Sequence, residues 1–282
     1  MIISVASGKG GTGKTTVATN LALSIVGTRH DVSLQFLDCD VEEPNAHIFL
    51  RPRMLESRPV ALPVPQVDLE KCTYCGKCAE VCQFSAIAVI KKNVLTFPEL
   101  CHGCGACSLL CPEDAITEVD REIGVLEIGR SDGIRFIHGV LEISEAMSPP
   151  LIKAVKEAAD NSGTTIVDVP PGTSCPVIEA VKDSDFCLLV TEPTPFGLND
   201  LILAVEMLRI LKIPFGVAIN RSDVGDDKVD DYCHREDIPI LMKIPMDRDL
   251  AVAYSKGIPV VAAKPEWKGK FIKLLDDIMR MV

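Results

Sequence analysis

The sequence predicts an α/β protein with a mostly parallel sheet, helices on both faces, and a small α+β block inserted into it. Short aliphatic runs alternate with segments of helical period over most of the 282 residues, as in strands joined by helical crossovers. Hydrophobic residues make up 47% of the chain and aromatic residues only 5%, which suits the aliphatic strands of parallel sheets. Eight of the twelve cysteines lie between Cys72 and Cys111, and they mark the inserted block.

The first elements run from a strand over 2–6 through a glycine loop to a helix over Lys14–Val26. A second strand over 32–37 leads directly into Asp38. The segment 51–65 contains four prolines and has no clear period. It is therefore predicted to be a connection without regular structure.

The alternation of predicted strands and helices resumes after Glu122 and continues toward the end of the chain. Strands are expected at 134–138, 164–169, 186–191, 215–219 and 240–244, and helices near 149–160, 176–183, 197–211 and 226–236. The last stretch, Glu266 to Val282, has apolar residues at helical spacing with basic residues beside them. We expect a terminal helix docked on the sheet, and the alternative is an amphipathic helix that binds a membrane surface.

Charge and hydropathy exclude several classes of protein. The net charge of -11 argues against a general nucleic-acid binder, which needs a basic surface. No apolar run approaches the length that spans a bilayer, and the N-terminal MIISVASGKGG lacks the features of a signal peptide. We therefore expect a cytoplasmic protein that associates with neither nucleic acid nor membrane.

A phosphate-binding loop follows the first strand. The segment that begins at Gly8 matches G-x-x-x-x-G-K-[ST] between a strand and a helix, which predicts a P-loop NTPase that binds the phosphates of a nucleotide. Lys14 should neutralise the β and γ phosphates, and the Thr15 hydroxyl should bind Mg²⁺. The predicted nucleotide-binding residues of the loop are Gly8, Gly10, Gly11, Thr12, Gly13, Lys14, Thr15 and Thr16.

Carboxylates follow two of the predicted strands, where ligands bind in open α/β sheets. Asp38 and Asp40 lie just past the second strand, although the acidic residues that follow them also allow a plain surface turn. Asp168 ends the apolar run TTIVDV, which is the position of a Walker B carboxylate that binds Mg²⁺ indirectly.

The cysteine block contains the pattern C-x2-C-x2-C-x3-C twice, in KCTYCGKCAEVCQFSAI and LCHGCGACSLLCPEDAI. This is the spacing of bacterial two-cluster ferredoxins, in which three cysteines of one motif and the fourth of the other hold each [4Fe-4S] cluster. Zinc is the competing interpretation, because C-x2-C pairs also build zinc sites. One departure is Gln83, which stands where the second copy has Pro112. The predicted ligand sets are Cys72, Cys75, Cys78 and Cys111 for one cluster and Cys101, Cys104, Cys107 and Cys82 for the other.

The string KGGTGKTT resembles the deviant Walker A motif of the MinD, ParA, Mrp and nitrogenase-iron-protein class. The resemblance implies that Lys9 reaches across an ATP-closed homodimer to the partner's nucleotide. It also implies that Asp40 lies near the attacking water and that Asp38 supports the metal site. These roles make Lys9, Lys14, Asp40 and Asp168 the predicted catalytic residues.

The same resemblance extends to the later motifs. DVPPGTS is similar to the family's D-x-P-P-G, which implies that the Gly172 N–H senses the γ-phosphate. Asn220 is implied to contact adenine, although the string Asn220-Arg221-Ser222-Asp223 also leaves guanine open. Pro245, in the stretch IPMD, occupies the place of a second loop beside the base.

The whole chain resembles the MinD-superfamily P-loop ATPases that contain an inserted ferredoxin domain. This resemblance implies a discontinuous ATPase domain, 1–64 and 121–282, around a ferredoxin domain at 65–120. It implies that ATP hydrolysis is coupled to electron transfer, or to delivery of a cluster, to a redox or iron–sulfur acceptor protein. The alternative is a positioning or scaffold ATPase with structural clusters. Cys175, just past the switch II motif, raises a minor hypothesis of a cluster that bridges the dimer, but no second cysteine lies within 121–160.

Overall fold

The computed structural model describes residues 1–26, 33–160 and 163–282. In this part of the chain the main sheet has nine strands in the order β11-β10-β9-β1-β8-β2-β7-β6-β3. The strands from β11 to β7 run parallel, and β6 and β3 are antiparallel to their neighbours. The predicted mostly parallel sheet is thus confirmed. The strands are β1 (Ile2–Ala6), β2 (Leu34–Asp38), β3 (Arg53–Val67), β6 (Ile116–Ser131), β7 (Ile134–Leu141), β8 (Thr164–Asp168), β9 (Phe186–Thr191), β10 (Phe215–Asn220) and β11 (Ile240–Ile244).

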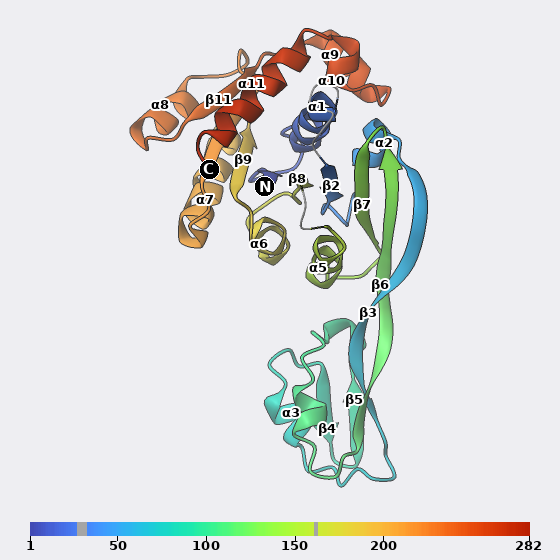
Figure 1. Ribbon diagram of the computed structural model, residues 1–282. Helices are drawn as coiled ribbons and strands as arrows, with labels where there is room; N and C mark the ends of the chain where they lie inside the picture. The colour runs from blue at the N-terminus through green and yellow to red at the C-terminus, as the bar shows by residue number, and fades with distance from the viewer. Residues whose placement is uncertain (27–32, 161–162) are drawn as a thin grey trace.

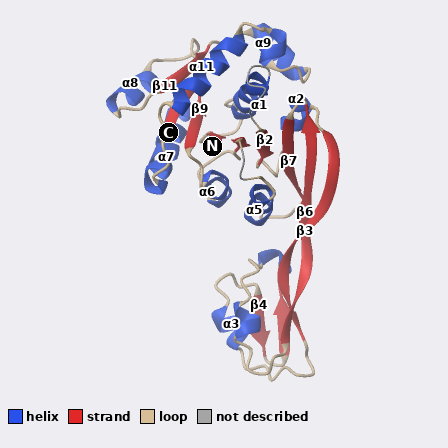
Figure 2. Cartoon of the chain, in the orientation of Figure 1, coloured by secondary structure: helices blue, strands red, loops and turns tan. Residues whose placement is uncertain are grey.

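Helices cover both faces of this sheet (Figures 1 and 2). One face carries α5 (Pro149–Glu157), α6 (Cys175–Val181), α7 (Pro195–Leu211) and α8 (Lys228–Arg235). The other carries α1 (Lys14–Val26), α2 (Ala46–Leu50), α9 (Arg248–Ser255), α10 (Val260–Ala263) and α11 (Trp267–Met279). The predicted helices are confirmed to within a few residues at their ends, whereas α2, α9 and α10 were not predicted. The first residue of the predicted strand 32–37 lies outside the described residues.

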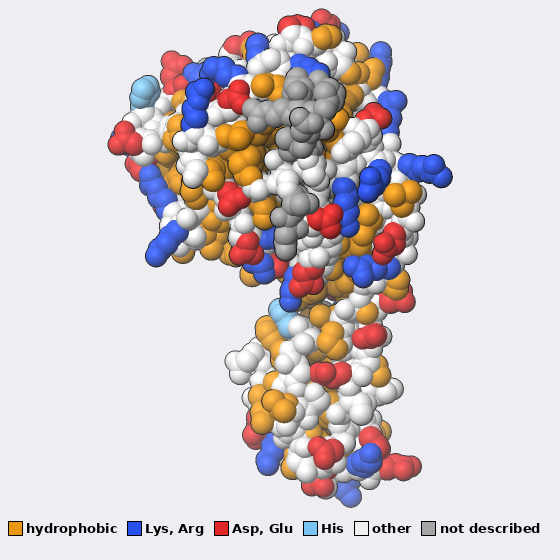
Figure 3. All heavy atoms as spheres, in the orientation of Figure 1, with side chains coloured by type: hydrophobic (Ala, Val, Ile, Leu, Met, Phe, Trp, Pro, Cys, Tyr) orange, Lys and Arg blue, Asp and Glu red, His pale blue; other side chains and the backbone are white. Residues whose placement is uncertain are grey.

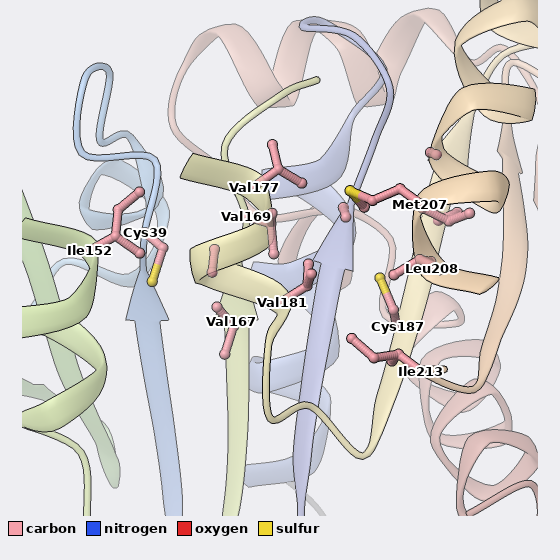
Figure 4. Close-up of a cluster of buried hydrophobic side chains, with 14 of the residues drawn as sticks. Cys39, Ile152, Val167, Val169, Val177, Val181, Cys187, Met207, Leu208 and Ile213 are labelled. Carbon is pink, nitrogen blue, oxygen red and sulfur yellow. The ribbon is translucent and has the colours of Figure 1, made fainter. Parts of the chain in front are cut away.

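The core between the sheet and the first group of helices is mainly aliphatic (Figure 4). Cys39, Cys187 and Cys233 are fully buried in it. Burial raises the pKa of the Cys39 and Cys187 thiols far above the ordinary value. These three cysteines therefore act as small apolar side chains.

The terminal helix α11 packs against α1, α10 and β11. Its apolar stripe is buried in the core on this face, which confirms the docked helix predicted from the spacing. Met281, also part of the predicted stripe, lies beyond the end of the helix and is 39% exposed. No helix within the described ranges is long and apolar enough to cross a membrane.

The prediction of an irregular connection at 51–65 is wrong, because this segment belongs to β3. Strand β3 pairs with the unpredicted β6 almost along its whole length, and together they form a two-stranded ribbon that leaves the sheet domain (Figure 1). Pro59, Pro63 and Pro65 are tolerated because β3 is an edge strand, where a missing N–H breaks no pairing on the open side. The expected domain limits at 65 and 120 fall within these two continuous strands.

The far end of the ribbon carries residues 68–115, here called the cysteine lobe (Figure 1). It contains α3 (Lys77–Val81), β4 (Ile87–Ile90), β5 (Asn93–Thr96), a 3-10 turn at Pro98–Leu100 and α4 (Ala106–Leu109). The Asp68 N–H donates to the Ala115 carbonyl and the Phe97 N–H to the Ala86 carbonyl, both at 2.8 Å. These two bonds are equivalent under the sequence repeat, so the lobe has internal two-fold symmetry.

Candidate functional site

A cleft of about 1140 Å³ opens at the carboxyl ends of the parallel strands. The glycine loop between β1 and α1 forms one wall, and Asp40, Asn220 and Pro245 line the others. The sheet thus brings together residues that are far apart in the sequence. The loop residues that line the cleft are Gly10, Gly11, Gly13, Lys14, Thr15 and Thr16.

The glycines of the loop are needed for two different reasons. Gly11 and Gly13 have φ of +78° and +97°, a conformation that L side chains rarely adopt. Gly8 lies behind the loop, where a Cβ would come within 2.3 Å of the Asp200 carbonyl oxygen. Gly8 therefore permits close packing, whereas Gly11 and Gly13 set the path of the backbone.

Lys14 and Asp40 form a buried ion pair at the entrance of α1. The distance from Lys14 Nζ to Asp40 Oδ2 is 3.3 Å, and the Lys14 side chain is only 7% exposed. Burial raises the pKa of Asp40, and the Lys14 charge opposes this shift. The lysine predicted to bind phosphate is thus held at the cleft by the carboxylate predicted to lie near the attacking water.

Two further carboxylates lie beneath the cleft on neighbouring strands. Asp38 and Asp168 are register partners in β2 and β8, and both are fully buried. Asp38 accepts hydrogen bonds from the N–H groups of Asp40 (3.2 Å) and Ala46 (3.0 Å). Neither Asp168 oxygen has a partner in hydrogen-bonding geometry. Burial raises the pKa of Asp168 to about 6, and the Lys14 charge and the neighbouring Thr15 hydroxyl oppose this shift. Unpartnered buried carboxylate oxygens are suited to a divalent cation, which supplies the missing positive charge.

Three predicted residues are engaged elsewhere in this conformation. The Gly172 N–H donates to the Ser7 carbonyl at 3.0 Å, so it is directed at the start of the glycine loop and not at a γ-phosphate. The Asn220 amide donates to the Thr12 carbonyl at 2.8 Å, although the residue still lines the cleft. Lys9 Nζ lies 3.6 Å from Glu192 Oε2 of the same chain.

Glu192 is a site residue that the sequence analysis missed. Its side chain is 8% exposed and its carboxylate faces two cations, Lys9 and Arg221, the latter at 2.9 Å. Glu192 directly follows β9. The rule that singled out Asp38 and Asp168, a carboxylate at the end of a parallel strand, would have found it.

The cysteine lobe contains two small cavities, each lined by four of the eight clustered cysteines. Three residues come from one motif and the fourth from the other, which is the grouping predicted for two cubane clusters. The first cavity is lined by Cys72, Cys75, Cys78 and Cys111, and the second by Cys101, Cys104, Cys107 and Cys82.

Backbone N–H groups point at the sulfurs in a repeated pattern. The N–H groups of Tyr74 and Gly103 donate to the sulfurs of the first cysteine of their motifs, each at 3.4 Å. The N–H groups of Ala86 and Ala115 donate to the sulfurs of Cys82 and Cys111, each at 3.3 Å. Donors of this kind stabilise thiolates.

The replacement of proline by Gln83 does not change the local path of the chain. Ser85 and Asp114, equivalent under the repeat, have similar left-handed φ values of 55° and 48°. The backbone therefore makes the same turn after Cys82 as after Cys111.

The fold and the cleft define a P-loop nucleotide-binding protein, with a glycine loop between a strand and a helix and carboxylates at the ends of the adjacent strands. The chain belongs to the CobQ/CobB/MinD/ParA nucleotide binding domain family, whose model matches residues 3–260.

Several known proteins are similar to this chain. The uncharacterized protein MJ0578 of Methanocaldococcus jannaschii is 36% identical over 228 residues, which are 80% of each chain. The iron-sulfur cluster carrier protein of Aquifex aeolicus is 28% identical over 94% of this chain and 63% of its own length. The cell division ATPase MinD of Pyrococcus furiosus has the same fold, with a TM-score of 0.59 and 22% identity over 100% of this chain and 99% of its own.

Proposed function

We propose that this protein is an ATP-binding and ATP-hydrolysing iron–sulfur protein. Its nucleotide cycle would be coupled to electron transfer, or to cluster delivery, to an acceptor protein. The observation that carries the proposal is the placement of the cysteine sets on a ribbon formed by two strands of the sheet that holds the phosphate loop. The similarity to iron-sulfur cluster carrier proteins supports it.

The buried ion pair suggests how phosphate enters the cycle. Lys14 is held by Asp40 at 3.3 Å in this conformation, and a β- or γ-phosphate is the stronger anion for the lysine. Binding of ATP would draw Lys14 away from Asp40 and leave that carboxylate free to orient water. Catalysis of this kind depends mainly on positioning and charge neutralisation.

Magnesium fits the carboxylates beneath the cleft. Thr15, together with the unpartnered and buried Asp168, would hold it, and Asp38 would support it from the neighbouring strand. When bound, Mg²⁺ would neutralise charge on the nucleotide phosphates.

Clusters fit the cysteine lobe better than zinc does. Tetrahedral zinc binds thiolates at about 2.3 Å and gathers them around one point. Each set of thiols surrounds a small cavity and receives N–H donors, as suits a cubane with one thiolate at each iron. The clusters would supply one-electron chemistry.

The test uses full-length protein prepared without oxygen. We expect about eight irons per chain, as two cubanes require, and ATP turnover that depends on Mg²⁺. Lys14→Ala should abolish turnover and keep the iron, because Lys14 is far from the cysteine lobe in the fold. Full turnover in Lys14→Ala would refute the nucleotide part of the proposal.

A second measurement separates coupling from scaffolding. Redox coupling predicts that nucleotide shifts a cluster reduction potential, and cluster delivery predicts ATP-dependent transfer to an apo acceptor. If nucleotide changes neither, and instead controls binding to lipid vesicles or DNA, the protein is a positioning ATPase with structural clusters.

A further inference from the structure

The two cysteine cavities lie at different distances from the nucleotide domain. The cavity of Cys101, Cys104, Cys107 and Cys82, here called the proximal set, is also lined by Pro63 and Pro65 of β3. A Cβ on Gly103 would come within 2.8 Å of Leu62 Cδ1, and Leu62 belongs to the core of the sheet domain. The other cavity touches the ribbon further out, at Val67 and Ile116. In Figure 3 the molecule narrows where the ribbon joins its two parts.

Arg121 of β6 stands at this junction, opposite Leu62 in the strand register. Its side chain is 21% exposed, and its Nη1 donates to Glu145 Oε2. Nε and Nη2 are buried without a hydrogen-bond partner. Glu145 raises the pKa of Arg121 most, and Glu99 and Cys101 raise it further, whereas burial opposes them. One end of the guanidinium is therefore fixed, and its register partner Leu62 lies against Gly103 of the segment that carries Cys101.

Glu145 belongs to a loop that lines the nucleotide cleft. Residues 142–146 form part of the cleft wall between β7 and α5. The Glu142 N–H donates to the Ile123 carbonyl of β6, and the preceding Leu141 N–H donates to the Val41 carbonyl, each at 2.9 Å. Val41 directly follows Asp40. The chain here is thus bonded both to the segment that directly follows Asp40, the carboxylate expected to lie near the attacking water, and to the ribbon.

We propose that the Arg121–Glu145 ion pair transmits nucleotide occupancy from the cleft to the proximal cysteine set, with Arg121 as a positioning residue for that set. The inference rests on the proposed function. It specifies the contacts through which nucleotide binding in the cleft would affect the cluster held by the proximal set. A change in the cleft wall moves Glu145, and Glu145 moves the cation beside Cys101. Reduction of a cubane adds one electron and one negative charge, which a nearby cation stabilises.

The test compares full-length holoprotein with and without Mg-ADP or a non-hydrolysable ATP analogue. Stepwise reduction by dithionite, followed by EPR, gives the midpoint reduction potential of each cluster. In the unchanged protein we expect nucleotide to shift one midpoint. In Arg121→Gln and Glu145→Gln that shift should be lost, and Arg121→Lys should restore part of it. Arg58→Gln is the matched control, because Arg58 lies on the same ribbon in an exposed ion pair with Glu56.

A second readout does not depend on cluster activity. Hydrogen exchange should show that nucleotide alters amide protection both in the loop 142–147 and in the segment 99–107, and Arg121→Gln should confine the change to the loop. Iron content and nucleotide affinity, measured for every variant, establish that the variants remain folded and loaded.

The outcomes separate the two proposals. If nucleotide shifts neither midpoint in the unchanged protein and does not alter exchange in 99–107, redox coupling itself fails. If both effects occur and persist fully in Arg121→Gln, coupling stands but the ion pair is not its route. Equal loss in Arg58→Gln would also overturn the inference, because the ribbon as a whole would then be responsible.

Discussion

Carboxylates at the ends of three parallel strands differ in what surrounds them. Asp168 at the end of β8 has no partner in hydrogen-bonding geometry, Asp38 at the end of β2 accepts two backbone N–H groups, and Glu192 after β9 faces two cations. Only Asp168 therefore has both oxygens free to bind a hydrated cation. Asp38 is fixed by the backbone and shapes the turn that carries Asp40. Glu192 instead controls the positions of basic side chains.

The close packing of Gly8 against α7 leads to a prediction about a single residue. Gly8→Ala should lower the free energy of unfolding by about 1–3 kcal/mol, because its Cβ would meet the Asp200 backbone at 2.3 Å. Urea unfolding of the protein without nucleotide measures the effect. The backbone of α7 cannot move away cheaply, since this helix packs on β9.

Gly10→Ala is the matched control for this substitution. A Cβ at Gly10 meets nothing within 4 Å, so its stability should change by less than about 0.5 kcal/mol. Equal stability of Gly8→Ala and Gly10→Ala would show that the loop adapts to the close contact.

The parallel strands were predictable from the sequence, and the ribbon was not. Strands such as β8 and β9 are covered on both faces, so they appear as continuous aliphatic runs. Strand β3 is an exposed edge with several prolines, and its order comes from pairing with β6, which is distant in the sequence. No local pattern encodes that pairing. The short helices α9 and α10 were missed for a similar reason, since few of their residues are buried.

The terminal helix α11 gives a prediction at the scale of the element. Leu274 is 1% exposed and lies in the core beside α1, so Leu274→Ala should destabilise the protein by about 2–5 kcal/mol. Met279→Ala, at a residue 48% exposed, should cost less than about 0.5 kcal/mol. Chemical unfolding compares them. If both variants are as stable as the unchanged protein and the protein sediments with lipid vesicles, α11 is a membrane-binding helix.

At the scale of the whole molecule, the sequence repeat predicted the cysteine sets but not their connection to the cleft. The grouping follows from spacing alone, because the fourth cysteine of each motif must join the other motif. Arg121 and Glu145 carry no motif. They meet because the ribbon returns to the sheet beside the loop after β7, a consequence of the three-dimensional fold.

Dimerisation is the remaining whole-molecule prediction. Lys9 is expected to reach a partner's nucleotide, but in this chain it pairs with Glu192 at 3.6 Å and its side chain is 31% exposed. Lys9 cannot pair with Glu192 of its own chain and contact the partner's nucleotide at the same time. Glu192 should therefore oppose dimerisation. A partly exposed pair contributes at most about 1 kcal/mol. A symmetric homodimer would break two such pairs, which corresponds to at most roughly thirtyfold in a dissociation constant.

Glu192→Gln should therefore tighten the ATP-analogue-dependent dimer by up to about thirtyfold, and Lys9→Ala should abolish it. Sedimentation velocity across a range of protein concentrations measures both. Glu206→Gln changes the net charge equally at an exposed position on α7 and should leave the dimer unchanged. If Glu192→Gln dimerises no more tightly than Glu206→Gln, the ion pair does not compete with the partner. If Lys9→Ala still dimerises, the lysine does not act across the interface. The competition would favour dimerisation with nucleotide bound, because a bound phosphate would offer Lys9 a stronger anion than the carboxylate that holds it within its own chain.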